Sequence, residues 1–148
     1  MKALVIYDSQ FGNTEQIAKA IGGGIGGEVK VVRFGEVSVA ELGSCDLLIV
    51  GSPTQGGRNT MAIKGFLGNI PADTLKNVRV AAFDTRIKMK LVKIFGYAAP
   101  RIADALKSKG GNLVAPAEGF FVKGAKGPIL DGELERAAAW AKAISEKK

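Results

Sequence analysis

Six residues near the start of the chain, Ser9–Thr14, combine hydroxyl and amide side chains with a glycine. They directly follow the apolar run Ala3–Tyr7 and precede a helical pattern that places Ile17 and Ile21 on one face. A short loop between a strand and a helix exposes backbone N–H groups at the positive end of the helix dipole, where an anion is stabilised. The sequence therefore predicts an anion site at this loop.

The side chains of the loop suit an uncharged donor set. Ser9 and Thr14 would supply hydroxyl groups, and Gly12 would let the backbone approach a ligand closely. Because no cationic residue lies in the loop, we expect neutral donors to hold any phosphate bound there. A structural alternative stays open, since the loop can be an ordinary connection with Asn13 or Thr14 as the helix cap.

The size and composition of the chain narrow its class. A length of 148 residues predicts a single domain over 1–148, and 47% hydrophobic residues indicate a globular fold. No apolar run approaches the roughly 20 residues that span a bilayer, and we expect no signal peptide. The single cysteine, Cys45, favours a reducing cytoplasm. The absence of histidine excludes a histidine-based catalytic triad, and no metal site is predicted.

Short apolar runs alternate with helical patterns along the chain, which is typical of buried parallel strands in an α/β sheet. Right-handed crossovers then give a three-layer doubly wound sandwich, a five-stranded parallel sheet of order 2-1-3-4-5. Pro116 cannot donate a ladder hydrogen bond, so the fifth strand should lie at an edge or be interrupted there. The expected strands are Ala3–Tyr7, Val29–Phe34, Asp46–Gly51, Val78–Phe83 and Asn112–Val122.

Two further segments have local interpretations. The glycine run Gly22–Gly27 fits G-x-G-x-x-G by composition, but it follows a helical pattern instead of opening one. We interpret it as a helix C-terminus and turn, which argues against a nicotinamide site. Near the other end of the chain, Asp131 is positioned to cap the last helix.

A hydroxyl residue, Gly12 and Thr14 after the first strand resemble the phosphate loop of the flavodoxin family, which binds flavin mononucleotide (FMN). Phe11 departs from the family pattern, which usually has a second Ser or Thr there. The resemblance covers essentially the whole chain and implies the flavodoxin-like fold, with FMN as the cofactor.

The resemblance also implies where FMN would bind, because the loops after the first, third and fourth strands meet at the switch point of the sheet. In the family, a glycine of the second loop turns over to hydrogen-bond the flavin N5, a role for Gly56 or Gly57 here. The implied cofactor-binding residues are Ser9, Gln10, Phe11, Gly12, Asn13, Thr14, Ser52, Pro53, Thr54, Gln55, Gly56, Gly57, Asp84, Thr85 and Arg86.

The ring end of this site differs from the family pattern. Gln55 stands where an aromatic residue often stacks on the flavin, so Met89, Phe95, Tyr97 or no side chain would cover the ring. A cation from Arg86 or Lys88 near the ring would stabilise the reduced, anionic flavin.

The net charge is +7, and its excess lies in one part of the chain. The span from 79 to 126 holds ten basic residues and three acidic ones, which makes the chain a basic variant of the family. Three interpretations stay open: a docking face for acidic redox partners, a segment at a membrane surface, or a solvated face. The membrane surface is the least favoured, and nucleic acid binding is not predicted because no recognised motif is present.

We therefore expect an FMN-binding flavoprotein that transfers electrons between redox partner proteins and has no catalytic residues of its own. The alternative is a flavodoxin-like FMN-dependent reductase or oxidase of the quinone or protoporphyrinogen type. A third possibility is a flavin-free binding module.

Overall fold

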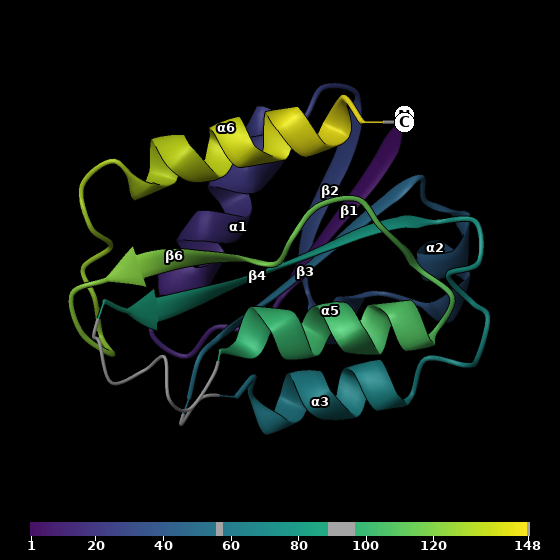
Figure 1. Ribbon diagram of the computed structural model, residues 1–148, viewed down its shortest axis with the longest axis horizontal. Helices are drawn as coiled ribbons and strands as arrows, with labels where there is room; N and C mark the ends of the chain where they lie inside the picture. Colours follow the sequence, from purple (N-terminus) through teal and green to yellow (C-terminus); the bar gives the residue numbers. More distant parts are fainter. Residues whose placement is uncertain (56–57, 89–96, 148) are drawn as a thin grey trace.

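A parallel sheet forms the centre of the computed structural model, which describes residues 1–55, 58–88 and 97–147 (Figure 1). Its strands pair in the order β2-β1-β3-β4-β5, and β6 also pairs with β4. This confirms the predicted order and the α/β class. The strands are β1 (Lys2–Tyr7), β2 (Glu28–Arg33), β3 (Leu47–Pro53), β4 (Arg79–Ile87), β5 (Asn112–Leu113) and β6 (Glu118–Val122).

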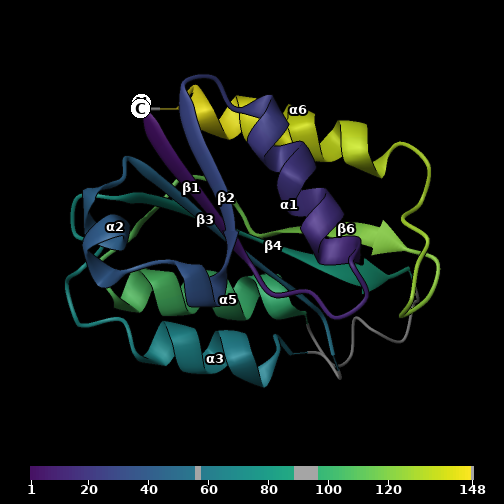
Figure 2. The same ribbon diagram turned by 180° about the vertical axis from the view of Figure 1, so that it is seen from behind.

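Helices cover both faces of the sheet. In Figures 1 and 2, α1 and α6 lie on one side of the strands, and α3 and α5 lie on the other. The helices are α1 (Asn13–Gly24), α2 (Val39–Ser44), α3 (Met61–Gly68), α5 (Ala98–Ser108) and α6 (Glu133–Ser145), with a short 3-10 helix η1 (Phe34–Glu36). The predicted three-layer sandwich is therefore confirmed.

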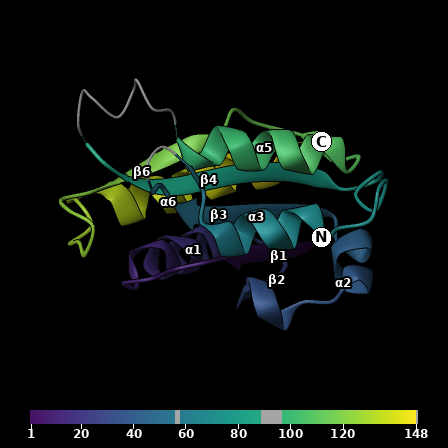
Figure 3. The ribbon, with the colours of Figure 1, turned by 90° about the horizontal axis from the view of Figure 1, so that it is seen from below.

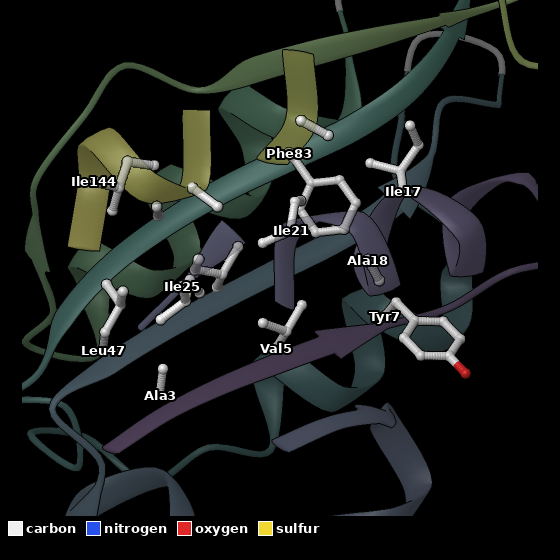
Figure 4. Close-up of a cluster of buried hydrophobic side chains, with 14 of the residues drawn as sticks. Ala3, Val5, Tyr7, Ile17, Ala18, Ile21, Ile25, Leu47, Phe83 and Ile144 are labelled. Carbon is white, nitrogen blue, oxygen red and sulfur yellow. The ribbon is translucent and has the colours of Figure 1, made fainter. Parts of the chain in front are cut away.

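The alternation of side chains along each strand divides the core in two. Val5 and Tyr7 of β1 pack towards α1 and α6, whereas Leu4 and Ile6 pack towards α3 and α5. Figure 4 shows the first cluster, in which Phe83 of β4 lies among helix and strand residues. Because both faces are covered, the strands are apolar on both sides, which explains the continuous apolar runs in the sequence.

The edge strand is interrupted as Pro116 predicts. Arg79 of β4 pairs with Asn112, and Phe83 pairs with Glu118, so four steps along β4 correspond to six along the edge. The extra residues form a break between β5 and β6 that includes Pro116. Both segments remain parallel to β4.

Two strands are longer than the sequence indicates. Ser52 and Pro53 belong to β3, and Asp84, Thr85 and Arg86 belong to β4, so these residues do not start loops as expected. The reason is pairing on both sides: Ser52 pairs with Asp84, and Arg86 pairs with Phe121 of β6. Pairing with β6, which is distant in sequence, thus extends β4 beyond its apolar run.

The glycine run ends α1, as interpreted from the sequence. Gly24 is the last residue of α1, and a Cβ at this position would lie 2.1 Å from the Ala138 carbonyl oxygen of α6. The lack of a side chain therefore lets α1 and α6 approach each other closely. Asp131 does not cap α6, because Gly132 occupies the N-cap position with a φ of 85°.

Candidate functional site

A cleft lies at the carboxyl ends of β1, β3 and β4, where the three predicted segments meet. Of the predicted site residues, those lining the cleft are Ser9, Gln10, Phe11, Asn13, Thr14, Pro53, Thr54, Gln55, Thr85 and Arg86. Ile87, Val122 and Ala125 also line it and were missed by the sequence analysis. Gly56 and Gly57 lie outside the described residues. The cleft is thus at the switch point that the strand order predicts.

The loop after β1 ends in an open helix terminus. Gly12 is the N-cap of α1 with a φ of 91°, in the left-handed region that glycine adopts without strain. The Gly12 N–H donates to Ser9 Oγ at 3.1 Å, and within the described chain no side chain caps the start of α1. The alternative with Asn13 or Thr14 as the cap is therefore wrong. The first-turn amides are available to an anion.

Thr14 connects this loop to β4. Its Oγ1 lies 2.8 Å from the Oγ1 of Thr85, and the two residues are 1% and 4% exposed. Both line the cleft, so two hydroxyl groups from distant parts of the chain lie side by side. This contact fixes the position of the loop relative to the sheet.

A buried carboxylate anchors the other end of the loop. Asp8 accepts hydrogen bonds from Thr60 Oγ1 at 2.6 Å and from Arg33 Nη2 at 3.0 Å. The same Arg33 nitrogen donates to the Ser9 carbonyl at 3.1 Å. These contacts could not be read from the sequence, because Arg33 ends β2 and Thr60 is the N-cap of α3, far apart along the chain. They hold the loop backbone in place from three elements.

The segment after β6 forms another wall of the cleft. Asn13 Nδ2 donates to the Ala125 carbonyl at 3.5 Å, and a Cβ on Gly127 would lie 2.7 Å from Asn13 Oδ1. Lys126 places its Nζ 5.9 Å from the centroid of the Phe11 ring. A cation therefore lies beside the loop that the sequence analysis expected to have only neutral donors.

Ser52 and Asp84 are fully buried, and neither is among the described residues that line the cleft. Ser52 Oγ accepts the Thr60 N–H at 3.0 Å and donates to the Pro53 carbonyl at 2.9 Å. Its side chain therefore joins the end of β3 to the N-cap of α3. Gly12 also is not among the lining residues, and its contribution is the backbone turn.

Three polar contacts position the end of β3. The Thr54 N–H donates to the Thr85 carbonyl at 2.8 Å, and Thr54 Oγ1 accepts the Ala98 N–H of α5 at 3.1 Å. Gln55 and Arg58 exchange backbone hydrogen bonds of 2.7 and 3.0 Å. Gln55 thus lines the cleft while bonded to Arg58.

Arg86 has a fixed position at the ring end. It makes two hydrogen bonds to the Asp84 carboxylate, and its guanidinium carbon lies 3.4 Å from the centroid of the Tyr97 ring. A Cβ on Gly119 would lie 2.1 Å from Arg86 Nε, so glycine makes room for the guanidinium. Tyr97, one of the candidates for covering the ring, thus contacts Arg86. The other two, Met89 and Phe95, lie outside the described residues.

The positive charge of Arg86 is balanced by the Asp84 carboxylate. Asp84 Oδ2 also accepts the Ala99 N–H of α5 at 2.9 Å. Burial raises the pKa of the Asp84 carboxyl, and the hydrogen bonds and charge of Arg86 oppose that rise. Arg86, one of the two cations considered for the ring end, is therefore paired with a buried carboxylate. The Nζ of Lys88 lies 5.6 Å from the Phe121 ring centroid.

The sequence profile that matches residues 5–140 is that of flavodoxin. The chain belongs to the flavodoxin family. A flavodoxin from the domain Archaea is 27% identical and superposes with a TM-score of 0.82, with 99% of this chain and 97% of that chain covered. Flavodoxin 2 from Bacillus cereus is 28% identical, with a TM-score of 0.81 and complete coverage of both chains.

The fold also matches that of a third solved structure, which is less similar in sequence. A WrbA-like protein from Agrobacterium tumefaciens is 19% identical, with a TM-score of 0.77, and the match covers 97% of this chain and 94% of that one. At this identity the likeness concerns the fold alone. Within residues 1–55, 58–88 and 97–147, no helix has the length and apolar character needed to cross a membrane.

Proposed function

We propose that this flavodoxin binds FMN in the cleft and carries electrons between redox partner proteins, some with acidic docking faces. The observation that carries the proposal is the meeting of an open helix N-terminus, at Ser9–Thr14, with the carboxyl ends of β3 and β4. Two flavodoxins that match over nearly their full length support it. Bound FMN would supply the electron transfer, and the chain would hold and orient it.

The donor set fits the phosphate group of FMN. The first-turn amides of α1 lack a side-chain acceptor in the described chain, and Ser9 and Thr14 line the adjoining cleft. A Cβ on Gly12 would meet no atom within 4 Å, which indicates open space beside the turn. Lys126 from the segment after β6 adds positive charge nearby. Amides, hydroxyls and a cation together suit a phosphate dianion.

The remaining residues of the cleft suit a ring system. Pro53, Ile87 and Val122 supply apolar surface, and Thr54 and Gln55 supply polar groups along the edge. We propose that Gly56 or Gly57, which stand between Gln55 and Arg58 in the sequence, hydrogen-bonds the flavin N5. The buried free thiol of Cys45 supports a reducing compartment, and we propose the cytoplasm.

The test is a fluorescence titration of FMN and of riboflavin with purified protein. We expect quenching of FMN fluorescence at a one-to-one ratio and weaker binding of riboflavin, which has the ring but no phosphate. Equal affinity for the two would argue against a phosphate site at Ser9–Thr14. Failure to bind FMN would overturn the proposal and favour a binding module.

A second measurement separates a carrier from an enzyme. The FMN-loaded protein is mixed with a quinone and a nicotinamide donor, and then with a reduced iron–sulfur protein. We expect rapid electron exchange with the iron–sulfur protein and no multiple turnover of the quinone. Sustained quinone turnover would replace the carrier proposal with the reductase alternative.

A further inference from the structure

A groove runs between α3 and α5, on the face of the sheet opposite α1 and α6. The two helices lie side by side in Figures 1 and 3, and residues from both line the groove. Its volume is about 430 Å³. This is far more than a single ion or water molecule needs, because a water molecule occupies about 30 Å³. The groove is large enough for several side chains of another protein.

The lining of the groove is strongly basic. Arg58, Lys64, Arg101 and Lys109 contribute cationic side chains, and the described residues that line it include no carboxylate. Helix α3 itself contains no acidic residue. Asp104 lies on α5 but is not among the lining residues. Positive charge is therefore concentrated in this groove, which favours an acidic occupant.

Apolar side chains accompany these cations. Met61 is 79% exposed at the start of α3 and lines the groove together with Leu67. Interface cores are enriched in methionine and are surrounded by a polar rim, and a flexible thioether adapts to the surface of a partner. Met61 and the three cations Arg58, Lys64 and Lys109 thus form the pattern expected of a docking surface.

The groove adjoins the proposed FMN cleft at Gln55 and Arg58. Gln55 lines the cleft, Arg58 lines the groove, and the two residues are joined by reciprocal backbone hydrogen bonds. A protein seated in the groove would therefore contact Arg58, which is hydrogen-bonded to a residue of the cleft wall. Such an occupant would lie close to the proposed cofactor site.

We propose that the groove between α3 and α5 docks an acidic segment of a redox partner, with an apolar side chain of that segment against Met61. The inference rests on the proposed function, because it specifies the surface through which that function operates. Charge complementarity argues for this occupant over a second copy of the chain, which would bring an equally basic groove.

The test uses the ¹⁵N-labelled protein and a short synthetic peptide rich in glutamate with interspersed leucine. NMR titration should shift amide signals of α3, α5 and Arg58, and binding should weaken as ionic strength rises from about 0.01 M to about 0.15 M. Shifts that centre on the cleft loop Ser9–Thr14 or on α6, or no binding at low salt, would overturn the proposal.

Two charge-reversal variants distinguish binding in this groove from attraction by the overall charge of the protein. Lys64→Glu alters an exposed lysine of the groove, and Lys142→Glu alters an exposed lysine of α6 on the opposite face, with the same change in net charge. Because reversal removes an exposed attraction and replaces it with a repulsion of similar size, peptide binding should weaken about 2- to 30-fold in Lys64→Glu. Equal weakening in the two variants would show attraction by net charge alone.

Measurement of FMN affinity keeps the two proposals distinguishable. Lys64→Glu should retain the FMN affinity of the unaltered protein, because Lys64 does not line the cleft. If FMN fails to bind at all, the proposed function is wrong. The set of amide signals that the peptide shifts still decides whether the groove docks an acidic segment.

Discussion

The Arg86 side chain donates two hydrogen bonds to the Asp84 carboxylate, from Nε to Oδ1 at 2.7 Å and from Nη2 to Oδ2 at 2.8 Å. The Asp84 side chain is completely buried, and that of Arg86 is 14% exposed. Arg86 lines the cleft, and the sequence analysis named it with Lys88 as a cation that would stabilise a reduced flavin if it lay near the ring. A neutral pair has a much weaker effect on a reduced, anionic flavin than a lone guanidinium would.

Removing the cation should destabilise the fold. In Arg86→Met the buried Asp84 carboxylate would lose its partner, and we expect a loss of about 3 kcal/mol in the free energy of unfolding, at the lower end for a broken buried ion pair because Arg86 is partly exposed. Urea denaturation measures this loss. The double variant Arg86→Met with Asp84→Asn should recover much of it, and an equally unstable double variant would contradict the explanation.

The pH dependence of stability should reveal Asp84. Since burial raises its folded pKa above the ordinary value of 3.8, the folded state binds the proton more tightly than the unfolded state does. The contribution of Asp84 to stability is therefore fully present below pH 3.8 and is lost as the pH rises through the folded pKa. The Asp84→Asn variant should not lose stability in this way, because the asparagine side chain does not titrate. A difference in unfolding free energy between the two proteins that is constant with pH would contradict the prediction.

The strands and the anion loop could be predicted because they depend on local sequence, and the strand order then followed from the doubly wound pattern. Val5 and its neighbours form an apolar run that is typical of a buried strand, and Gly12 follows it after a short loop. The glycine run after α1 was likewise identified from its position. These features require no knowledge of which residues meet in space.

Contacts between distant segments could not be predicted in this way. The roles of Asp84 and Arg86 depend on β6, which pairs along β4 and extends it, and the anchoring of Ser9 depends on Arg33 at the end of another strand. The cap of α6 was misassigned for a different reason: Gly132 reaches a positive φ that Asp131 does not adopt. Backbone conformation at that position outweighs side-chain capping.

The close approach of α1 and α6 can be tested with two adjacent glycines. Gly24→Ala would place a Cβ against the Ala138 carbonyl oxygen, and we expect a loss of about 1–3 kcal/mol in stability. In Gly23→Ala the new Cβ meets no atom within 4 Å, so helix propensity should stabilise the protein by about 0.5–1 kcal/mol. Thermal or urea unfolding measures both. Effects of the same sign in the two variants would contradict the packing explanation.

The thiol of Cys45 should be unreactive in the folded protein. Burial raises its pKa to about 11, so little thiolate is present near pH 8. A thiol-reactive disulfide reagent should therefore label the native protein far more slowly than the protein in denaturant, which serves as the control. Equal labelling rates would show that Cys45 is accessible in the native state.

The proposed phosphate site predicts opposite outcomes for two substitutions of Thr14. Thr14→Val keeps the shape of the side chain but removes the hydroxyl group, whereas Thr14→Ser keeps the hydroxyl. A hydrogen bond to a charged group contributes about 1.5–3 kcal/mol, so FMN affinity should fall about 10- to 100-fold in Thr14→Val and little in Thr14→Ser. Fluorescence titration measures both. Riboflavin separates a phosphate contact from a structural effect, because Thr14 also contacts Thr85. If Thr14→Val weakened riboflavin and FMN equally, its hydroxyl would act by fixing β4 and not by holding the phosphate.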